Sequence, residues 1–297
     1  MNYYNEIKTE LINNEITKRV KDYSKNRSDL NTYYNVGKLL SEAGKHYGKG
    51  IIKEYSDRLS SELNIKYSVR TLYKIIKYFN YMNKQKVPTV SAKLSWSHYD
   101  ELLKLTDENI INYYIKISEE QNLSVRELRK KFKSNEYERL DEETKKKLKN
   151  KEELKVPDLV KNPIQIKNTS GNNEISEKIL QKLILEDIPS FLKELGSGFS
   201  FIDNEYKIKM GDRYNYIDLL LYNIKYKCYV VVELKVTELN SNHTGQIQKY
   251  MNYIDKNIKS IDDNKTVGII ICKKENKYVI EYCSDDRIIA REYELYR

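Results

Sequence analysis

The sequence predicts a two-domain α+β protein, in which an all-α N-terminal domain is followed by an α/β core with a mixed sheet. Apolar residues recur at helical spacing through the first 150 residues, as at Ile51, Tyr55 and Leu59. After residue 199 the apolar runs become continuous and rich in β-branched residues, which is typical of strands buried on both faces. The chain of 297 residues is also long enough for two domains of about 150 residues each.

The first domain is predicted to span residues 1–155 and to be basic. Residues 1–150 hold 30 Lys and Arg against 21 Asp and Glu, whereas residues 151–297 hold 23 of each kind. The whole net charge of +9 therefore belongs to the first domain. A nucleotide-biased genome would explain the number of lysines but not this asymmetry. A cationic module of this kind is suited to holding a phosphate backbone electrostatically.

Two predicted helices of this domain have the layout of a helix-turn-helix. The helix at 51–63 is followed by a short turn and by a second helix that begins after Ser68. Arg70, Lys74 and Lys77 would point outward from this second helix, and they are the predicted DNA contacts. Two packed helices with a solvated basic face would show the same pattern, so both interpretations stay open.

A linker is predicted at residues 156–173, because prolines and a Thr-Ser-Gly-Asn-Asn run interrupt the periodic segments there. The second domain, at 174–297, begins with a helix that ends before Gly196. The strand, helix and strand at its end imply a crossover and hence a mixed sheet. The expected elements are a helix at 174–195, strands at 199–209, 214–222 and 228–235, a helix at 241–256, and strands at 266–272, 278–282 and 288–293.

Charged residues lie within two of these apolar strands. Asp218 lies in the middle of one, and Glu233 and Lys235 end the next. Side chains two residues apart in a strand share a face, so Glu233 and Lys235 project together while Leu234 points the opposite way. If the two strands pair as a hairpin, Asp218 comes alongside Glu233. An ionised carboxylate buried in a strand costs several kcal/mol unless something pairs with it.

A divalent cation is the partner that these residues predict. Two converging carboxylates form a hard oxygen site that suits Mg²⁺ or Mn²⁺. The metal would offset the charge of a phosphodiester and polarise the phosphorus. Lys235 would orient the attacking water or stabilise the pentavalent phosphate. Either acid alone would more simply mark a place where a strand leaves the core, but the three residues together favour a metal site.

The predicted helix at 241–256 carries a further polar pair. Gln246 and Tyr250 are four residues apart and share one face of the helix. An amide and a phenol can hold a water molecule or a phosphate. On residue type alone, an ordinary amphipathic helix with Ile247 and Met251 buried is the simpler interpretation.

The order and spacing of Ile217-Asp218, Glu233-Leu234-Lys235 and the pair Gln246 and Tyr250 resemble the PD-(D/E)XK nuclease superfamily. The Gln-Tyr pair is similar to an extra motif of its RecB-like branch. The resemblance implies a restriction-endonuclease-like core with the element order αβββαβ, a divalent metal and cleavage of phosphodiester bonds in DNA. It implies that Asp218 and Glu233 are metal ligands and that Lys235 orients the water or acts as electrophile, with Gln246 and Tyr250 as auxiliary catalytic residues.

Three longer segments resemble the YhcG family of this superfamily, namely residues 191–201, 216–222 and 232–235. Residues 94–98, Leu-Ser-Trp-Ser-His, resemble a segment of that family's N-terminal domain, so the likeness covers nearly the whole chain.

Nucleases of this kind often add a glutamate from the first core helix to the metal site. Glu194 and Glu177 are the candidates for that role in this chain. One departure from the family pattern is Ile217, which stands where the motif has proline. That residue shapes the backbone and does not touch the metal, so we expect activity to be retained.

The leading hypothesis is a Mg²⁺- or Mn²⁺-dependent deoxyribonuclease whose basic domain holds DNA. A DNA-binding or complex-forming adaptor with a silent nuclease core is the alternative, and a protein-binding scaffold is the third. Three cysteines are too few and too widely spaced for a disulfide framework or a zinc cluster. The sequence shows no apolar span of about 20 residues and no secretion signal, so a cytoplasmic protein without a membrane anchor is expected. A homodimer and protein partners in DNA processing are further expectations.

Overall fold

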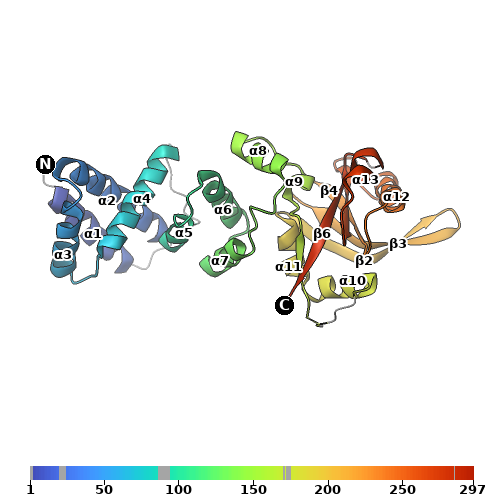
Figure 1. Cartoon of the computed structure of the whole chain (residues 1–297), viewed down its shortest axis with the longest axis horizontal. Helices are drawn as coiled ribbons and strands as arrows, with labels where there is room; N and C mark the ends of the chain where they lie inside the picture. Colours follow the sequence, from blue (N-terminus) through green and yellow to red (C-terminus); the bar gives the residue numbers. More distant parts are fainter. Residues whose placement is uncertain (1–2, 20–24, 86–93, 170, 172–174, 284) are drawn as a thin grey trace. The chain divides into compact units, whose positions relative to one another are not determined.

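The computed structural model describes residues 3–19, 25–85, 94–169, 171, 175–283 and 285–297 (Figure 1). The chain divides into two compact units, Met1–Ser134 and Asn135–Arg297. Helices make up the described part of the first unit, and the second contains a six-stranded mixed sheet. The predicted fold class, an all-α half followed by an α/β core, is confirmed.

Amphipathic helices build the first unit around an apolar centre. Leu11, Leu40, Leu59 and Ile75 come from four different helices and are fully buried in one cluster. No helix in the described part of the chain has the length and apolar character needed to cross a membrane. The helices are α1 (Tyr3–Arg19), α2 (Lys25–Tyr47), α3 (Ile51–Leu63), α4 (Val69–Gln85), α5 (Trp96–Leu102), α6 (Glu108–Glu120) and α7 (Val125–Lys133).

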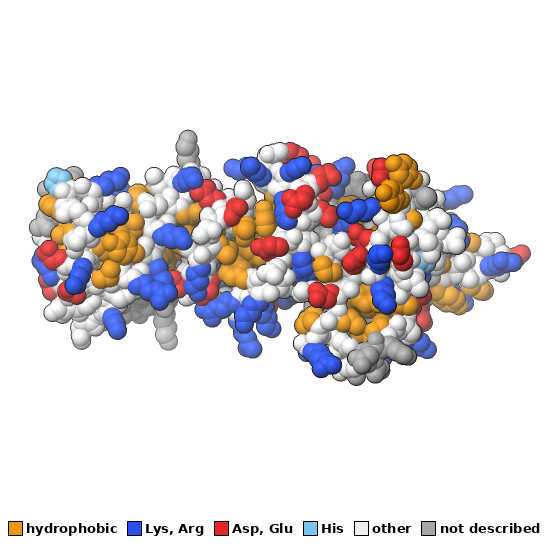
Figure 2. Space-filling model, viewed as in Figure 1, with side chains coloured by type: hydrophobic (Ala, Val, Ile, Leu, Met, Phe, Trp, Pro, Cys, Tyr) orange, Lys and Arg blue, Asp and Glu red, His pale blue; other side chains and the backbone are white. Residues whose placement is uncertain are grey.

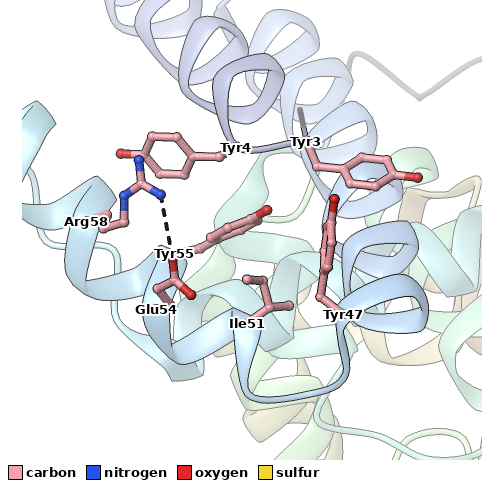
Figure 3. Close-up of a pocket in the computed structure, with 7 residues that line it drawn as sticks. All are labelled: Tyr3, Tyr4, Tyr47, Ile51, Glu54, Tyr55 and Arg58. Atoms are coloured by element: carbon pink, nitrogen blue, oxygen red, sulfur yellow. Dashed lines mark ion pairs between the residues drawn. The ribbon is translucent and has the colours of Figure 1, made fainter. Parts of the chain in front are cut away.

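A hollow of about 260 Å³ opens between the start of α1, the end of α2 and α3 (Figure 3). The charged groups in its wall are paired with each other and with a ring. The guanidinium of Arg58 lies 3.5 Å from the Glu54 carboxylate and 3.7 Å from the centroid of the Tyr4 ring. The lining residues are Tyr3, Tyr4, Tyr47, Ile51, Glu54, Tyr55 and Arg58, and none of them is a predicted DNA contact.

The second unit is built on one sheet in the order β1-β6-β5-β4-β3-β2. The three strands β2, β3 and β4 are antiparallel neighbours, whereas β4, β5, β6 and β1 pair in parallel. The strands are β1 (Ile164–Lys167), β2 (Phe199–Met210), β3 (Arg213–Asn223), β4 (Cys228–Leu234), β5 (Asn264–Cys272) and β6 (Ile288–Tyr296). The helices are α8 (Glu142–Asn150), α9 (Val156–Leu159), α10 (Glu177–Glu186), α11 (Ile188–Leu195), α12 (Ser241–Asn257) and α13 (Lys277–Cys283).

Apolar clusters cover both faces of this sheet. Leu180 of α10 belongs to one cluster together with Val230 and Val232 of β4. Ile247 of α12 belongs to the other cluster, which includes Val231 of β4. Both faces of β4 are therefore buried, which explains its uninterrupted apolar sequence and means that a charged residue at its end is enclosed by protein.

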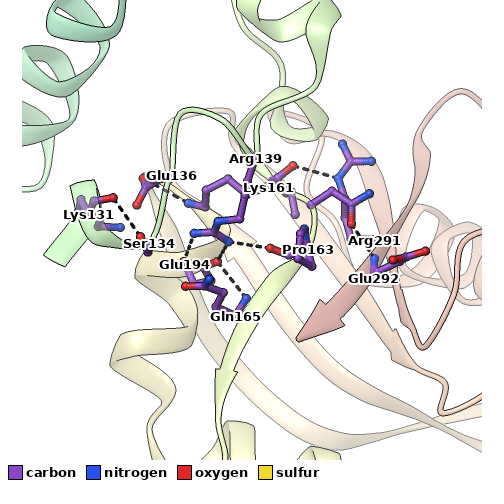
Figure 4. Close-up of polar contacts among 12 residues, drawn as sticks. Lys131, Ser134, Glu136, Arg139, Lys161, Pro163, Gln165, Glu194, Arg291 and Glu292 are labelled. Atoms are coloured by element: carbon purple, nitrogen blue, oxygen red, sulfur yellow. Dashed lines mark hydrogen bonds and ion pairs between the residues drawn. The ribbon is translucent and has the colours of Figure 1, made fainter. Parts of the chain in front are cut away.

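The two units divide between Ser134 and Asn135, which is earlier than the linker predicted at 156–173. Polar contacts join residues 135–155 to the rest of the second unit (Figure 4). Arg139 binds the Glu194 carboxylate and donates to the Pro163 carbonyl at 2.6 Å. Arg291 of β6 pairs with Asp141 at 2.6 Å. These partners are far apart in the sequence, so no local pattern indicates the contacts.

Several local predictions need correction. The predicted linker contains α9 and β1, because Ile164 and Ile166 are buried where β1 pairs with β6. The strand predicted at 278–282 is the helix α13, at whose start the Asn276 side chain accepts a hydrogen bond from the Val279 amide at 3.3 Å. Parts of the predicted linker and first helix, residues 170 and 172–174, lie outside the described residues.

The helix predicted at 174–195 is in fact two helices, α10 and α11. The Asp187 side chain caps α11 by accepting from the Ser190 amide at 3.2 Å, and Pro189 occupies its first turn. Proline at this position suits the start of a new helix but not the interior of a long one. The side chains of α10 and α11 therefore do not follow the spacing of one continuous helix.

Candidate active site

Strands β3 and β4 separate at the point where Asp218 lies. Their backbone pairing extends only as far as Leu219 and Val232. Beyond this pair, the Asp218 Oδ2 atom accepts a hydrogen bond from the Leu234 amide at 2.8 Å. The carboxylate thus takes the place of a backbone carbonyl and stays attached to the end of β4.

Glu233 and Lys235 lie together at that end. The Lys235 Nζ atom is 3.4 Å from Glu233 Oε2, and the Glu233 side chain is only 1% exposed. Leu234, between them, is buried in the cluster on the opposite face. The Lys235 amide donates to the Ile271 carbonyl of β5 at 2.8 Å, which fixes the backbone just after β4. The structure therefore brings the three principal predicted residues together.

The charges at this site are poorly compensated. Burial, followed by the nearby Asp218 carboxylate, raises the pKa of Glu233 to about 8, although Lys235 acts in the opposite direction. Burial also raises the pKa of Asp218, against the effects of the Leu234 amide and Lys235. The Glu233 Oε1 atom accepts no hydrogen bond from the described residues. A buried oxygen without a donor, beside a second carboxylate, is suited to binding a cation.

Of the two candidate glutamates, Glu177 lies at this site and Glu194 does not. Glu177, in the first turn of α10, has its Oε2 atom 3.8 Å from Lys235 Nζ. Glu194, in α11, binds Arg139 and accepts from the Gln165 amide at 3.0 Å (Figure 4). The assignment of Glu194 as a metal ligand is therefore corrected: its carboxylate is engaged elsewhere because α10 and α11 are separate helices.

Gln246 and Tyr250 of α12 contact each other as their spacing suggests. The Gln246 amide donates to the Tyr250 hydroxyl at 3.2 Å, and the Tyr250 ring is buried. Burial raises the pKa of Tyr250, and the charges of Glu233 and Asp218 add to this effect. Tyr250 is therefore close enough to both carboxylates for their charges to raise its pKa, and it keeps its proton at neutral pH.

The sequence-based prediction did not include three further residues at the site. The Gln181 side chain, one turn after Glu177, donates to the Asp218 carbonyl at 3.1 Å and thereby ties α10 to β3. His243, at the start of α12, has its pKa lowered by burial and by Lys235. The charge of Glu205, in β2, contributes to the raised pKa of Asp218. Nothing in their local sequence distinguishes them, because only the fold brings them near Asp218 and Lys235.

The predicted DNA contacts of α4 lie in different environments. Arg70 is exposed at the start of the helix. Lys74 pairs with Asp100 at 2.5 Å, and Lys77 donates to the Leu103 carbonyl. Two of the three cations therefore hold α4 to the segment around α5, and their role toward DNA stays a prediction.

The carboxylates fit a divalent cation that keeps part of its water shell. Among the described residues, no three or more His, Cys, Asp or Glu side chains form a complete cage for a metal. Mg²⁺ is usually bound through only one or two carboxylates, with water and substrate phosphate filling the other positions. Asp218 and Glu233 satisfy that requirement, and the Glu233 oxygen without a donor is a free ligand atom.

Comparison with known families agrees with this geometry. Residues 157–296 match the YhcG PDDEXK nuclease domain, and residues 9–139 match the DUF1016 N-terminal domain. The two matched ranges together cover most of the chain. All three principal site residues, Asp218, Glu233 and Lys235, fall within the range that matches the YhcG PDDEXK nuclease domain, and α4 falls within the range that matches the DUF1016 domain.

Each match covers only part of the related protein's length. The chain is 24% identical over 219 residues to the "Putative nuclease YhcG" of Escherichia coli (strain K12), covering 70% of this chain and 58% of that protein. A repair endonuclease from Pyrococcus abyssi matches with 19% identity and a TM-score of 0.29, over 43% of this chain and 50% of the other. EndoMS in a complex with dsDNA matches with 18% identity and a TM-score of 0.30, over 44% and 48%. The chain thus spans about half the length of these proteins.

Proposed function

We propose that this protein is a divalent-metal-dependent endonuclease that hydrolyses phosphodiester bonds in DNA. The observation that carries the proposal is the enclosed Glu233 carboxylate, which has one oxygen without a donor and lies beside Asp218 and Lys235. Most buried side-chain polar atoms have at least one hydrogen-bond partner. The match of residues 157–296 to the YhcG PDDEXK nuclease domain supports the same assignment.

Asp218 and Glu233 would hold the metal, which we propose to be Mg²⁺ or Mn²⁺. When bound, the cation would offset the negative charge of the phosphodiester and polarise its phosphorus. Lys235 places its ammonium 3.4 Å from Glu233, where it can donate to an attacking water or to a phosphate oxygen. The Glu177 carboxylate lies 3.8 Å from the same ammonium, so we propose it as a positioning residue for Lys235.

Gln246 and Tyr250 would complete the polar wall of the site from α12. The Gln246 amide already donates to the Tyr250 hydroxyl, which leaves the phenolic proton available for a phosphate oxygen or a water molecule. The raised pKa of Tyr250 keeps that proton in place. We therefore propose donor roles for both residues.

The first unit would hold the DNA. Residues 1–134 contain 25 Lys and Arg against 16 Asp and Glu, so the net charge of +9 stays with this unit at its observed boundary. A polyanion would be attracted to such a unit in a salt-dependent manner. The exposed Arg70 of α4 is the predicted contact that the structure leaves most accessible.

Nicking of supercoiled plasmid with Mg²⁺ or Mn²⁺ tests the proposal. Asp218→Asn keeps the shape of the side chain but removes its charge, and Lys235→Ala removes the ammonium. Both variants should lose cleavage by at least ~100-fold, since groups that act directly on the reacting centre contribute effects of this size. Glu281→Gln is a matched control because Glu281 is an exposed carboxylate of α13.

The outcome separates the hypotheses. Cleavage by the wild type and by Glu281→Gln, with loss in both site variants, supports the proposed nuclease. Equal cleavage by all four proteins in the presence of EDTA would contradict it. DNA binding without cleavage by the wild type would instead support the adaptor hypothesis.

A further inference from the structure

The β2–β3 hairpin extends well beyond the sheet. Strand β3 pairs with β4 only over residues 219–223, whereas its pairing with β2 continues to Arg213 beside the turn. We call residues 204–217 the arm, and its two strands are joined at Gly211 and Asp212. Figure 1 shows the arm projecting past the other strands of the second unit. The arm is therefore a two-stranded ribbon whose residues make no backbone pairing with β4.

One face of the arm is covered. Ile208 and Ile217 are buried and belong to the cluster that contains Ile247 and Tyr250 of α12. The other face is open. Lys207 and Lys209 are exposed, Tyr214 is 55% exposed and Tyr216 is 52% exposed. The alternation of buried and exposed residues along both strands assigns these four residues to the same side.

Lysine and tyrosine alternate across the ladder on this open face. Lys207 is paired in register with Tyr216, and Lys209 with Tyr214. The Lys207 ammonium lies 3.9 Å from the centroid of the Tyr214 ring, and that of Lys209 lies 5.9 Å from it. Lys207 thus contacts the Tyr214 ring, and both tyrosine side chains stay exposed. Neighbouring exposed aromatic side chains on one face are typical of interaction sites.

The same face leads to the proposed active site. Tyr214, Tyr216 and Asp218 alternate along β3, so they lie on one side of the strand, with about 7 Å between successive members. Glu205 is the acidic residue of the arm whose charge acts on Asp218, so the positive charge of the arm begins at Lys207. A polyanionic strand reaching Asp218 along this face would pass both lysines and both rings.

We propose that the open face of the arm binds unpaired nucleotides next to the scissile phosphate, and this inference rests on the proposed nuclease function. Lys207 and Lys209 contact backbone phosphates, while Tyr214 and Tyr216 stack on bases. Proteins that hold single strands without reading their sequence combine cationic side chains with aromatic platforms in this way. In a duplex the bases are already stacked on each other, so the rings would have no partner of this kind.

The test measures binding in EDTA of a fluorescein-labelled oligothymidylate of 12 nucleotides and of a duplex of equal length, by anisotropy. The double variant Lys207→Ala/Lys209→Ala should bind the single strand about tenfold more weakly. Its slope of log K against log salt should be smaller by about 1.4, because two phosphate contacts are lost. The control is Lys256→Ala/Lys265→Ala, which removes the same charge from exposed positions of the same unit and should change affinity by less than about twofold.

The tyrosines are tested separately. Tyr214→Leu/Tyr216→Leu keeps apolar bulk on the ribbon but removes the rings, so the arm should stay folded. We expect at least about tenfold weaker binding of the single strand with an unchanged salt slope, because stacking is worth ~1–3 kcal/mol per base. The control is Tyr278→Leu/Tyr282→Leu, two exposed tyrosines of α13, and it should bind like the wild type. Unchanged circular dichroism in each variant excludes unfolding.

Three results would overturn the proposal: no binding of the oligothymidylate by the wild type, arm variants that bind it as tightly as their controls, or equal losses for duplex and single strand. Because binding is measured without metal, these outcomes are independent of catalysis. Failure of the wild type to nick plasmid would contradict the proposed nuclease function. A defect in single-strand binding confined to the arm variants would still support the proposed binding role of the arm.

Discussion

Replacing Glu233 with glutamine should stabilise the metal-free protein at neutral pH. In the folded chain, burial and Asp218 raise the pKa of Glu233 to about 8 from an ordinary value of 4.5. The folded protein therefore binds a proton that the unfolded chain releases. Stability from this group is fully present below about pH 4.5 and is lost as the pH rises toward 8. Glutamine has the same shape but no titration, so Glu233→Gln avoids this loss.

The magnitude follows from the shift in pKa. Each pH unit between the unfolded and folded pKa values is worth up to about 1.4 kcal/mol. The stability advantage of Glu233→Gln over the wild type should therefore grow by about 2 kcal/mol between pH 5 and pH 7. Titrating groups that do not interact with Glu233 contribute equally to both proteins and cancel in the comparison.

Urea unfolding in EDTA, followed by circular dichroism at both pH values, measures this difference. Trp96 is the only tryptophan and lies in the first unit, so its fluorescence provides an internal reference that should not change with the substitution. A stability difference that is the same at pH 5 and pH 7 would refute the reasoning. It would mean that the Glu233 carboxylate is ionised and satisfied without metal.

Three other predictions concern neighbouring groups. Saturating Mg²⁺ should raise the melting temperature of the wild type but not of Glu233→Gln, because a ligand stabilises only the state that binds it; equal shifts in differential scanning calorimetry would contradict this. Glu194→Gln should destabilise the second unit by about 3 kcal/mol in urea, since the buried Arg139 loses its charged partner, while Mg²⁺ binding by calorimetry stays unchanged. Tyr250→Phe should reduce the rate of plasmid nicking by ~10–100-fold with little change in DNA affinity, because only a donor to the reacting phosphate is lost; an unaltered rate would assign Tyr250 to packing.

The strands that carry the site were predictable because their sequences differ from their surroundings. Burial on both faces of β4 gives an uninterrupted apolar run, and Glu233 stands out against it. The period of two then determines that Lys235 shares its face. The helical spacing of Gln246 and Tyr250 likewise indicated one shared face, and the structure shows the hydrogen bond between them.

The choice between the two glutamates depended on a helix boundary that the prediction missed. Glu177 and Glu194 fall in one predicted helix, but Asp187 as a cap and Pro189 in the next turn are a sequence signal for a second helix. The boundary between the units was less visible. Arg139 lies in a charged segment that resembles a solvated tether, and its partner is a residue of α11. Contacts between residues distant in sequence leave no local pattern.

The arm shows a related limit. Lys207 and Tyr214 fit the ordinary alternating pattern of a strand. This alternation alone does not indicate which face of the strand the rest of the domain covers. The register of β2 with β3 and the early end of the β3–β4 pairing determine that their face is open.

The location of a bound cation tests the central claim most directly. Crystals soaked in Mn²⁺ and measured at a wavelength where manganese scatters anomalously would reveal it without reference to activity. We predict one anomalous peak coordinated by an oxygen of Asp218 and an oxygen of Glu233. A manganese ion bound only elsewhere, or no peak at this position under saturating Mn²⁺, would contradict the proposed metal site.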